Sequence, residues 1–111
     1  MTDRELLEAA AKAAGLKIHA ARQAERDEEG CASAGLWIVN GSTCWNPLTD
    51  DGDALRLAVR LRLVLFLEIP RIGIGPRMDG PEVYVDEGEN EYAATRRAIV
   101  RAAAELGRSR T

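Results

Sequence analysis

The sequence contains little of what catalytic and metal-binding sites are usually built from. It has one histidine and two cysteines, Cys31 and Cys44, which do not form a C-x-x-C pair. We therefore expect no metal site, no bound cofactor and no disulfide framework, and we expect both thiols to be reduced. No known catalytic signature is visible, so no residue is assigned a catalytic role. The sequence therefore favours a protein that is not an enzyme, but it does not exclude enzymatic activity.

Long apolar runs and a strong charge imbalance are also missing. No apolar run reaches the length needed to cross a membrane, and the charged residues 2–5 are unlike the start of a signal peptide. The net charge of −3 gives no bulk attraction to nucleic acid. The 111 residues, 46% hydrophobic and 30% charged, suit a single globular domain over residues 1–111. We expect a cytoplasmic protein that has no membrane partner.

The most informative stretch is Trp45–Leu67. Asn46-Pro47 predicts a turn, because proline restricts its own backbone and that of the residue before it. Thr49 or Asp50 can then act as the N-cap of a helix that we expect over Asp51–Leu61. This helix is apolar on most sides, so we expect it to be largely buried against neighbours on more than one side.

A continuous apolar run follows this helix. Residues Leu63–Leu67 predict a strand that is buried on both faces. Burial on both faces requires helices on both sides of the sheet, which is a layered α/β/α arrangement.

Three elements are expected before this stretch. Thr2 and Glu5 form a capping box for a helix over Asp3–Ala14, and Leu16–Ala20 alternates as a half-buried strand does. Residues 22–35 are charged and then small, which is typical of a long loop. The dipeptide Asn40-Gly41 predicts a hairpin between strands 36–39 and 42–45, with one tryptophan buried and the other partly exposed.

Three elements are expected after it. Residues 70–81 contain three prolines and three glycines, so we expect the long irregular tip of a hairpin. The return strand is Glu82–Asp86, and Asn90 can cap a final helix over Glu91–Leu106 that ends at Gly107. Alanine on the apolar side of this helix allows it to approach its neighbour closely.

Together these elements predict an α+β fold, a three-layer α/β/α sandwich whose mainly antiparallel sheet has four to five strands and is covered by three helices. The expected core comes from both the central stretch and the final helix. It consists of Leu55, Ala58, Val59, Leu63, Leu65, Leu67, Ile99 and Leu106.

Two blocks of the chain, Trp45–Val59 and Tyr92–Gly107, resemble in order and spacing the phage ABA sandwich domain, a family of small phage and prophage proteins of unknown function. The resemblance implies an α/β/α sandwich and a bacteriophage or prophage origin, hence the cytoplasm of a bacterial host. It implies no established activity and no catalytic residues.

Three groups of residues are candidates for a binding site. Trp45 and Asn46 can line a pocket with Asp50, Asp51 and Asp53, and the only sensible guest beside three aspartates is a cation. Capping of the helix is the favoured reading of the same aspartates.

The second group, Ile74, Arg77 and Met78, lies in the expected hairpin tip and suits a contact surface. The third is a row of arginines in the last helix, chiefly Arg97 and Arg101, which can attract phosphate or an acidic partner. Pairing of these arginines with the acidic segment 79–91 is the favoured alternative, and we expect no binding of nucleic acid at physiological salt.

The leading hypothesis from the sequence is therefore a phage accessory protein that binds a host or phage protein. An inhibitor of a bacterial defence system is one version of it, and self-association into a homo-oligomer is left open. The alternatives are a small-ligand or cation-binding protein or enzyme that uses the pocket near Trp45, and a weak nucleic-acid binder.

Overall fold

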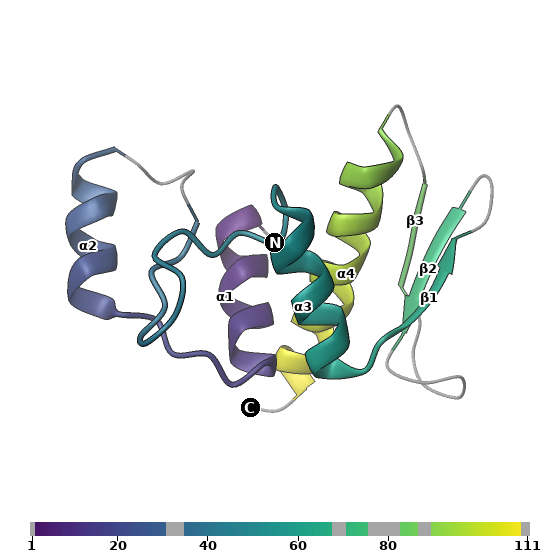
Figure 1. The fold of residues 1–111 in the computed structure, drawn as a ribbon, viewed down its shortest axis with the longest axis horizontal. Coiled ribbons are helices and arrows are strands. Elements are labelled where there is room, and N and C mark those ends of the chain that lie inside the picture. The colour runs from purple at the N-terminus through teal and green to yellow at the C-terminus, as the bar shows by residue number, and fades with distance from the viewer. Residues whose placement is uncertain (1, 31–34, 68–70, 76–82, 87–89, 110–111) are drawn as a thin grey trace.

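The computed structural model describes residues 2–30, 35–67, 71–75, 83–86 and 90–109, with side chains in 2–30, 35–64 and 90–108. These residues form, in chain order, α1 (Asp3–Ala13), α2 (Ala20–Glu28), α3 (Asp51–Leu61), β1 (Val64–Leu67), β2 (Arg71–Gly75), β3 (Val83–Asp86) and α4 (Glu91–Ser109). Helices α1, α3 and α4 lie together and run in the same direction (Figure 1). Helix α2 stands at one end of the molecule and the strands at the other.

Helices α1, α3 and α4 begin where the sequence predicts. Thr2 and Glu5 form the capping box of α1, and the Asp50 carboxylate accepts the Asp53 backbone N–H as N-cap of α3. The Asn90 side chain accepts the backbone N–H groups of the first turn of α4. These predictions are confirmed because each depends on contacts within a few residues of the chain.

The contact between α1 and α4 is the most extensive between two described helices. Many of the buried residues of these helices are small, including Ala10 of α1, its C-cap Ala14, and Ala98, Ala102 and Ala103 of α4. Gly107 lies so close to α1 that a β-carbon there would stand 2.1 Å from the Ala9 carbonyl oxygen. The prediction that Gly107 ends the helix is therefore wrong: α4 continues to Ser109, and the glycine serves close packing instead of a cap.

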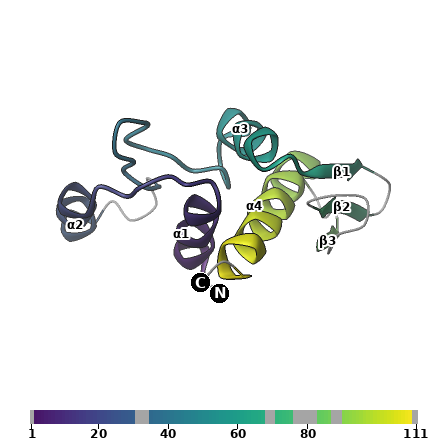
Figure 2. The ribbon, with the colours of Figure 1, turned by 90° about the horizontal axis from the view of Figure 1, so that it is seen from below.

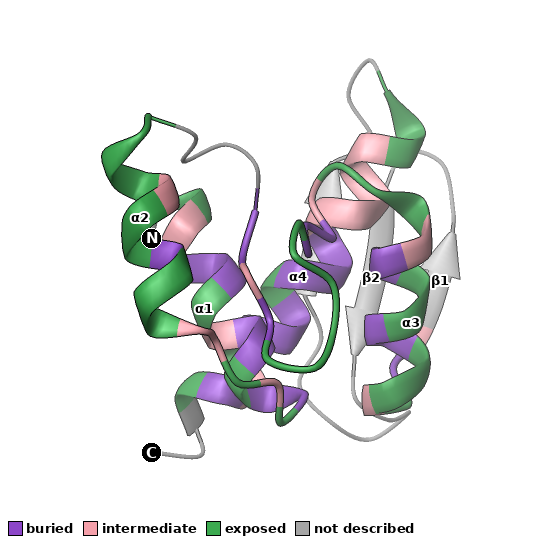
Figure 3. Ribbon diagram, turned by 60° about the vertical axis from the view of Figure 1, so that its left-hand side comes forward, coloured by how far each residue is buried: buried purple, intermediate pink, exposed green. Residues whose placement is uncertain are grey.

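Helix α3 packs against α4 with one face only. Leu57 and Ala58 are buried at 3% and 2% exposed, whereas Leu55 and Val59 are 60% and 67% exposed. Figure 3 shows this division along the helix, purple on one side and green on the other. The prediction that α3 is buried on more than one side is wrong, because no second layer of the described structure covers its outer side.

The three strands form an antiparallel sheet in the order β1-β2-β3. Helix α4 contacts β2 and β3, and in Figure 2 the described helices all lie on the same side of the sheet. The expected three-layer α/β/α sandwich of the α+β class is therefore wrong. The core formed by the described side chains is helical, and the described part of the chain has four helices and three strands in place of three helices and four to five strands.

The middle strand of the sheet lies where no regular structure was expected. Residues 71–75 pair with both β1 and β3, so the predicted direct pairing of Leu63–Leu67 with Glu82–Asp86 is wrong. The prolines of the region fall outside this strand, and Gly73 is paired with Phe66 and Tyr84. Glycine is tolerated in a strand when larger residues stand beside it, a neighbourhood that composition alone does not reveal.

The expected strand at Leu16–Ala20 and the expected hairpin over residues 36–45 are reduced to two isolated bridges. Ile18 pairs with Ile38, and Leu36 exchanges two 2.9 Å backbone hydrogen bonds with Trp45. The predicted turn needs a positive φ at both Asn40 and Gly41, but of these two only Asn40 has one. The Ile38 N–H bonds to the Ser42 carbonyl, so a regular ladder does not continue. The segment still buries Trp45 and leaves Trp37 half-buried, as predicted.

Helix α2 (Ala20–Glu28) occupies the first half of the region predicted to be a loop, so the prediction is wrong for that half. His19, expected on a strand, is the N-cap, and its Nδ1 accepts the Arg22 N–H. The buried Gln23 accepts the Trp37 N–H at 2.6 Å and donates to the Gly35 carbonyl. Charged residues cover the rest of the helix, which is why its sequence lacks the apolar stripe of an ordinary helix.

The predicted core is partly correct. Ala58, Leu63 and Ile99 are buried and Leu106 is half-buried, but the exposed Leu55 and Val59 contradict the prediction. The other two predicted core residues, Leu65 and Leu67, have side chains outside those described. Within the described residues, no helix combines the length and the apolar character that crossing a membrane requires.

Candidate functional site

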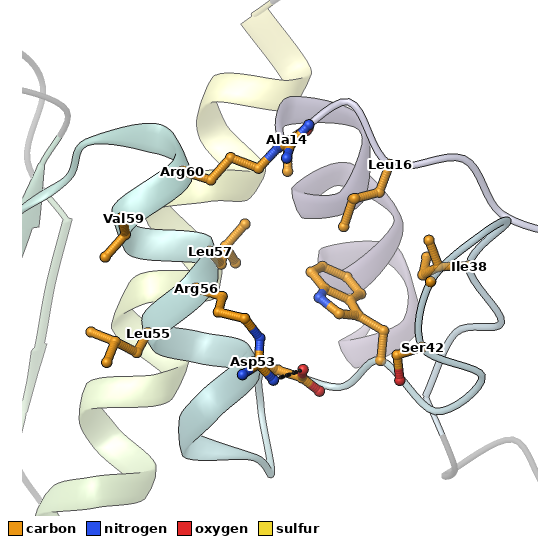
Figure 4. A pocket seen from close by; sticks show the side chains of 12 residues that line it. Ala14, Leu16, Ile38, Ser42, Asp53, Leu55, Arg56, Leu57, Val59 and Arg60 are labelled. Carbon is orange, nitrogen blue, oxygen red and sulfur yellow. Dashed lines mark hydrogen bonds and ion pairs between the residues drawn. The ribbon is translucent and has the colours of Figure 1, made fainter.

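A cavity of about 660 Å³ opens between the end of α1, the segment 38–45 and α3 (Figure 4). The chain passes through this region three times, and each pass contributes part of the wall. The lining residues are Ala14, Leu16, Ile38, Gly41, Ser42, Trp45, Asp53, Leu55, Arg56, Leu57, Val59 and Arg60.

The inner wall of the cavity is apolar. Leu57 reaches it from α3, and Leu16 and Ile38 reach it from the opposite side (Figure 4). Trp45 completes the wall and is only 7% exposed, held in place by its paired hydrogen bonds to Leu36. An apolar wall of this kind favours an apolar guest, because covering it removes hydrocarbon surface from water.

The edge of the cavity carries charge that is mostly positive. Arg56 donates to Asp53 at 2.8 Å, and Asp53 also accepts the backbone N–H of Asn46 at 3.0 Å. Arg60, one turn further along α3, donates from Nε to the carbonyl of Ala14 at the end of α1. The terminal nitrogens of Arg60 have no carboxylate partner among the described residues.

The predicted pocket near Trp45 is present, but its chemistry differs from the prediction. Trp45 and Asp53 line it, whereas Asp50 and Asp51 do not. Asp50 caps α3, and Asp51 accepts Arg96 of α4 at 2.6 Å. Asn46 is buried in the turn, where its side-chain oxygen accepts the Leu48 N–H. Each of the three carboxylates already accepts a hydrogen bond, and Asp51 and Asp53 are also ion-paired with arginines, so the cluster attracts a cation less than three unpaired carboxylates would.

A second feature adjoins the cavity, which we call the α3 outer face: Leu55, Arg56, Val59, Arg60 and the C-cap residue Arg62. Leu55 and Val59 are one helical turn apart and form an exposed apolar ridge. Arg56 and Arg60 stand on one side of this ridge, and the C-cap residue Arg62 follows it at the end of the helix. The face is therefore apolar in the middle and basic along one side and at its C-terminal end.

The arginines of α4 mostly hold the helices together. Arg97 donates to Asp3 of α1 at 3.0 Å, and this hydrogen bond holds the pKa of the Asp3 carboxyl below its ordinary value. Arg96 donates to Asp51 and to the Leu48 carbonyl of the α3 approach. The helix therefore does not present a row of unpaired cations.

The remaining predicted arginines add little to such a row. Arg101 is exposed and forms no ion pair with a described residue, and Arg108 pairs with Glu105. The predicted pairing with the acidic segment 79–91 falls mainly outside the described residues, as does Arg110.

The second predicted group is only partly described. Ile74 lies in β2, paired with Leu65 and Val83 in the register of the sheet. Its side chain is outside those described, and Arg77 and Met78 lie outside the described residues altogether. Their expected role as a contact surface stays a prediction.

The reactive side chains of the described residues do not come together. Cys44 is an exposed free thiol, and its Sγ lies 3.8 Å from the Thr43 hydroxyl. The Nδ1 atom of His19 is used as a helix cap. Within the described ranges, no three residues of the types His, Cys, Asp and Glu are grouped as a metal site requires.

Sequence reasoning missed the residues that define this site. It placed Leu55 and Val59 in the core and did not connect Leu16, Ile38 and Leu57. One signal could have found the exposed ridge: α3 is apolar on more sides than the few other elements of so short a chain can cover. The meeting of Leu16 with Leu57 depends on tertiary packing and has no local signal.

Comparison of the chain with protein-family models, with curated proteins and with solved structures finds no match. The resemblance of Trp45–Val59 and Tyr92–Gly107 to phage proteins therefore stays a prediction, and the function must be argued from the site.

Proposed function

We propose that this is a non-enzymatic binding protein that holds another protein against the α3 outer face and the cavity beside it. One observation carries the proposal: Leu55 and Val59 are 60% and 67% exposed on a helix whose opposite side lies in the core. Large apolar side chains grouped on a surface and bordered by charge are typical of protein-binding sites.

The site is better suited to binding than to catalysis. A catalytic site needs a nucleophile, base or metal within reach of the substrate. The described lining of the cavity contains neither cysteine nor histidine, and its one carboxylate, Asp53, is bound by Arg56 and by the backbone of Asn46. The groups that remain can attract and orient a partner but supply no proton transfer.

The biological setting of the proposal rests on the resemblance alone. A phage or prophage accessory protein would meet its host or phage partner in the cytoplasm of the bacterial cell. Inhibition of a bacterial defence system is one activity that such binding can produce. The residues of the site support the binding step and do not choose among its consequences.

Site-specific cross-linking tests the proposal. A photoreactive amino acid is introduced at Leu55 or, separately, at Val59, and the protein is irradiated in bacterial cells. We expect both positions to give the same cross-linked protein, because they lie on one ridge. The adduct should disappear when Arg60 is also replaced by glutamate, since that change alters the margin of the same face.

Tyr92 supplies the matched control, because it is 65% exposed and apolar but lies at the start of α4. A photoreactive group at Tyr92 should not give the same adduct. Equal labelling from Tyr92 and Leu55, or no adduct from either ridge position, would contradict the proposal.

A further inference from the structure

We infer that the segment held by the α3 outer face is an acidic amphipathic helix, with apolar side chains on the Leu55–Val59 ridge and carboxylates at the basic margins. This inference rests on the proposed function and adds to it the chemistry of the partner. It follows from which charges of α3 are already paired inside the protein and which are not.

The negative charges near α3 are used internally. Asp53 is paired with Arg56, and its side chain is 9% exposed. Asp51 is paired with Arg96, and Asp50 accepts the N–H of Asp53 as helix cap. The acidic first turn of α3 is therefore already engaged with donors of this chain.

The positive charges at the other end of α3 are not used in this way. Arg60 and Arg62 are exposed, and within the described residues neither has a carboxylate within 4.0 Å. Arg60 makes a hydrogen bond to the Ala14 carbonyl, which leaves its terminal nitrogens available for a second acceptor. The charge that the outer face offers to a partner is consequently positive, although the whole chain has a net charge of −3.

The apolar ridge fixes the shape of the partner. Leu55 and Val59 are four residues apart, which places them about 6 Å apart along the helix axis. A second helix laid beside them can pack side chains at its own i and i+4 positions into the same rows.

A second copy of this chain is the competing partner. In a two-fold contact a residue of one copy meets a different residue of the other unless it lies on the axis, so the basic end of one α3 would meet the acidic first turn of the other. In that turn Asp51 and Asp53 are already paired with Arg96 and Arg56. A separate acidic helix instead brings carboxylates that have no partner inside this chain.

Defined peptides test the inference. A labelled helical peptide of about 16 residues carries leucines along one face and glutamates on both sides of them, and a second peptide has lysines in place of the glutamates. We expect the acidic peptide to bind at least about tenfold more tightly, measured by fluorescence anisotropy at low salt. Its affinity should fall as the salt concentration rises.

Variants of the face complete the test. Arg60→Glu should reverse the preference between the two peptides, and Arg62→Asn should weaken only the acidic one. Circular dichroism confirms that each variant is folded. Arg108→Glu, which changes an arginine at the far end of α4, should leave both affinities unchanged.

Equal affinity for both peptides, or no binding of either, would overturn the inference. It would also be overturned if the wild-type protein is a dimer in analytical ultracentrifugation and the double substitution Leu55→Lys with Val59→Lys makes it a monomer. If cross-linking from Leu55 still captures a protein while the peptides show no preference, the proposed function stands and the acidic helix is rejected. If both experiments fail, both proposals fall.

Discussion

The α1–α4 contact and the outer face of α3 use apolar residues in opposite ways. Between α1 and α4 the side chains are small, and the backbones approach until Gly107 leaves no room for a β-carbon beside Ala9. On the outer face of α3 the side chains are large, and Leu55 and Val59 remain more than half exposed. The first contact is completed within the chain, whereas the second surface has no described neighbour.

Helix α2 shows a third kind of attachment. It is held by the buried Gln23, by the Arg4–Asp27 ion pair at 2.8 Å, and by Arg26 over the ring of Trp37 at 4.7 Å. These are polar or charged contacts, which depend on geometry and solvent more than an apolar core does. The stability of the fold is therefore concentrated in α1 and α4. Changes on the outer face of α3, or in the polar contacts that hold α2 (the α2 tether), should lower the free energy of unfolding by less.

The sharpest test of this comparison uses two leucines of α3. Leu57→Ala should lower the free energy of unfolding by about 2–5 kcal/mol, because it removes buried methyl groups and leaves a cavity. Leu55→Ala, two residues away on the exposed side, should change it by less than about 1 kcal/mol. Urea denaturation of both variants measures the difference. Similar losses for the two would mean that the outer face is covered by a part of this chain.

The close approach of α1 and α4 predicts the second-largest loss of stability. Gly107→Ala should destabilise the protein by about 1–3 kcal/mol through overpacking against the Ala9 carbonyl, despite the better helix propensity of alanine. Gly52→Ala in the first turn of α3 is the control, since its β-carbon would meet only mobile side-chain ends of Arg56 and Asp50.

Thermal and urea unfolding of these glycine variants give the result. We expect Gly52→Ala to be neutral or stabilising. A stable Gly107→Ala protein would show that the two helices can separate without loss and would break the comparison.

The contacts that hold α2 should weaken when the side-chain amide of Gln23 is removed. Gln23→Leu leaves the Trp37 N–H and the Gly35 carbonyl without their side-chain partner, at a cost of about 1–2 kcal/mol. Hydrogen exchange should accelerate in α2 and around Trp37, while α1 and α4 keep their protection. The control is Glu25→Ala, which removes only an exposed ion pair to Arg22. Uniform acceleration across all helices would contradict a separate tether.

Low pH should weaken the Arg4–Asp27 ion pair that helps to hold α2, with the smallest effect on stability among these predictions. The hydrogen bond from Arg4 holds the pKa of Asp27 below the ordinary value of about 3.9. A lowered pKa in the folded state means that the ion pair stabilises fully above the ordinary value and is lost as the pH falls below it. Titration of the Asp27 carboxyl by NMR should show the lowered pKa, and Arg4→Leu should raise it toward the ordinary value. The same pKa in both proteins would count against the pairing.

Local signals in the sequence predict the helices better than the layers. The caps at Thr2, Asp50 and Asn90 each involve contacts within one turn, so the starts of α1, α3 and α4 are predictable. The end of α4 is not, because Gly107 resembles a helix terminator until the neighbouring Ala9 is known. Helix α2 is missed because its single buried residue, Gln23, is polar.

The candidate site is predictable in part for the same reason. The pocket beside Trp45 and the start of α3 follows from their closeness along the chain. Its charge does not, because Arg96 reaches Asp51 from 45 residues away and neutralises one of the aspartates that suggested a cation. The exposure of Leu55 and Val59 depends on how few other elements are available to cover α3, which is seen only when the whole chain is considered.

The shared direction of α1, α3 and α4 has an electrical consequence. In an antiparallel bundle the helix dipoles largely cancel, whereas here three of them add. The positive pole of the molecule receives Asp3, Asp51 and Glu91, and the opposite pole receives Lys12, Arg60 and Arg108. The side chains thus oppose the backbone field at both poles. A partner that approaches the C-terminal pole first meets arginine and lysine, with the carbonyl ends of three helices behind them.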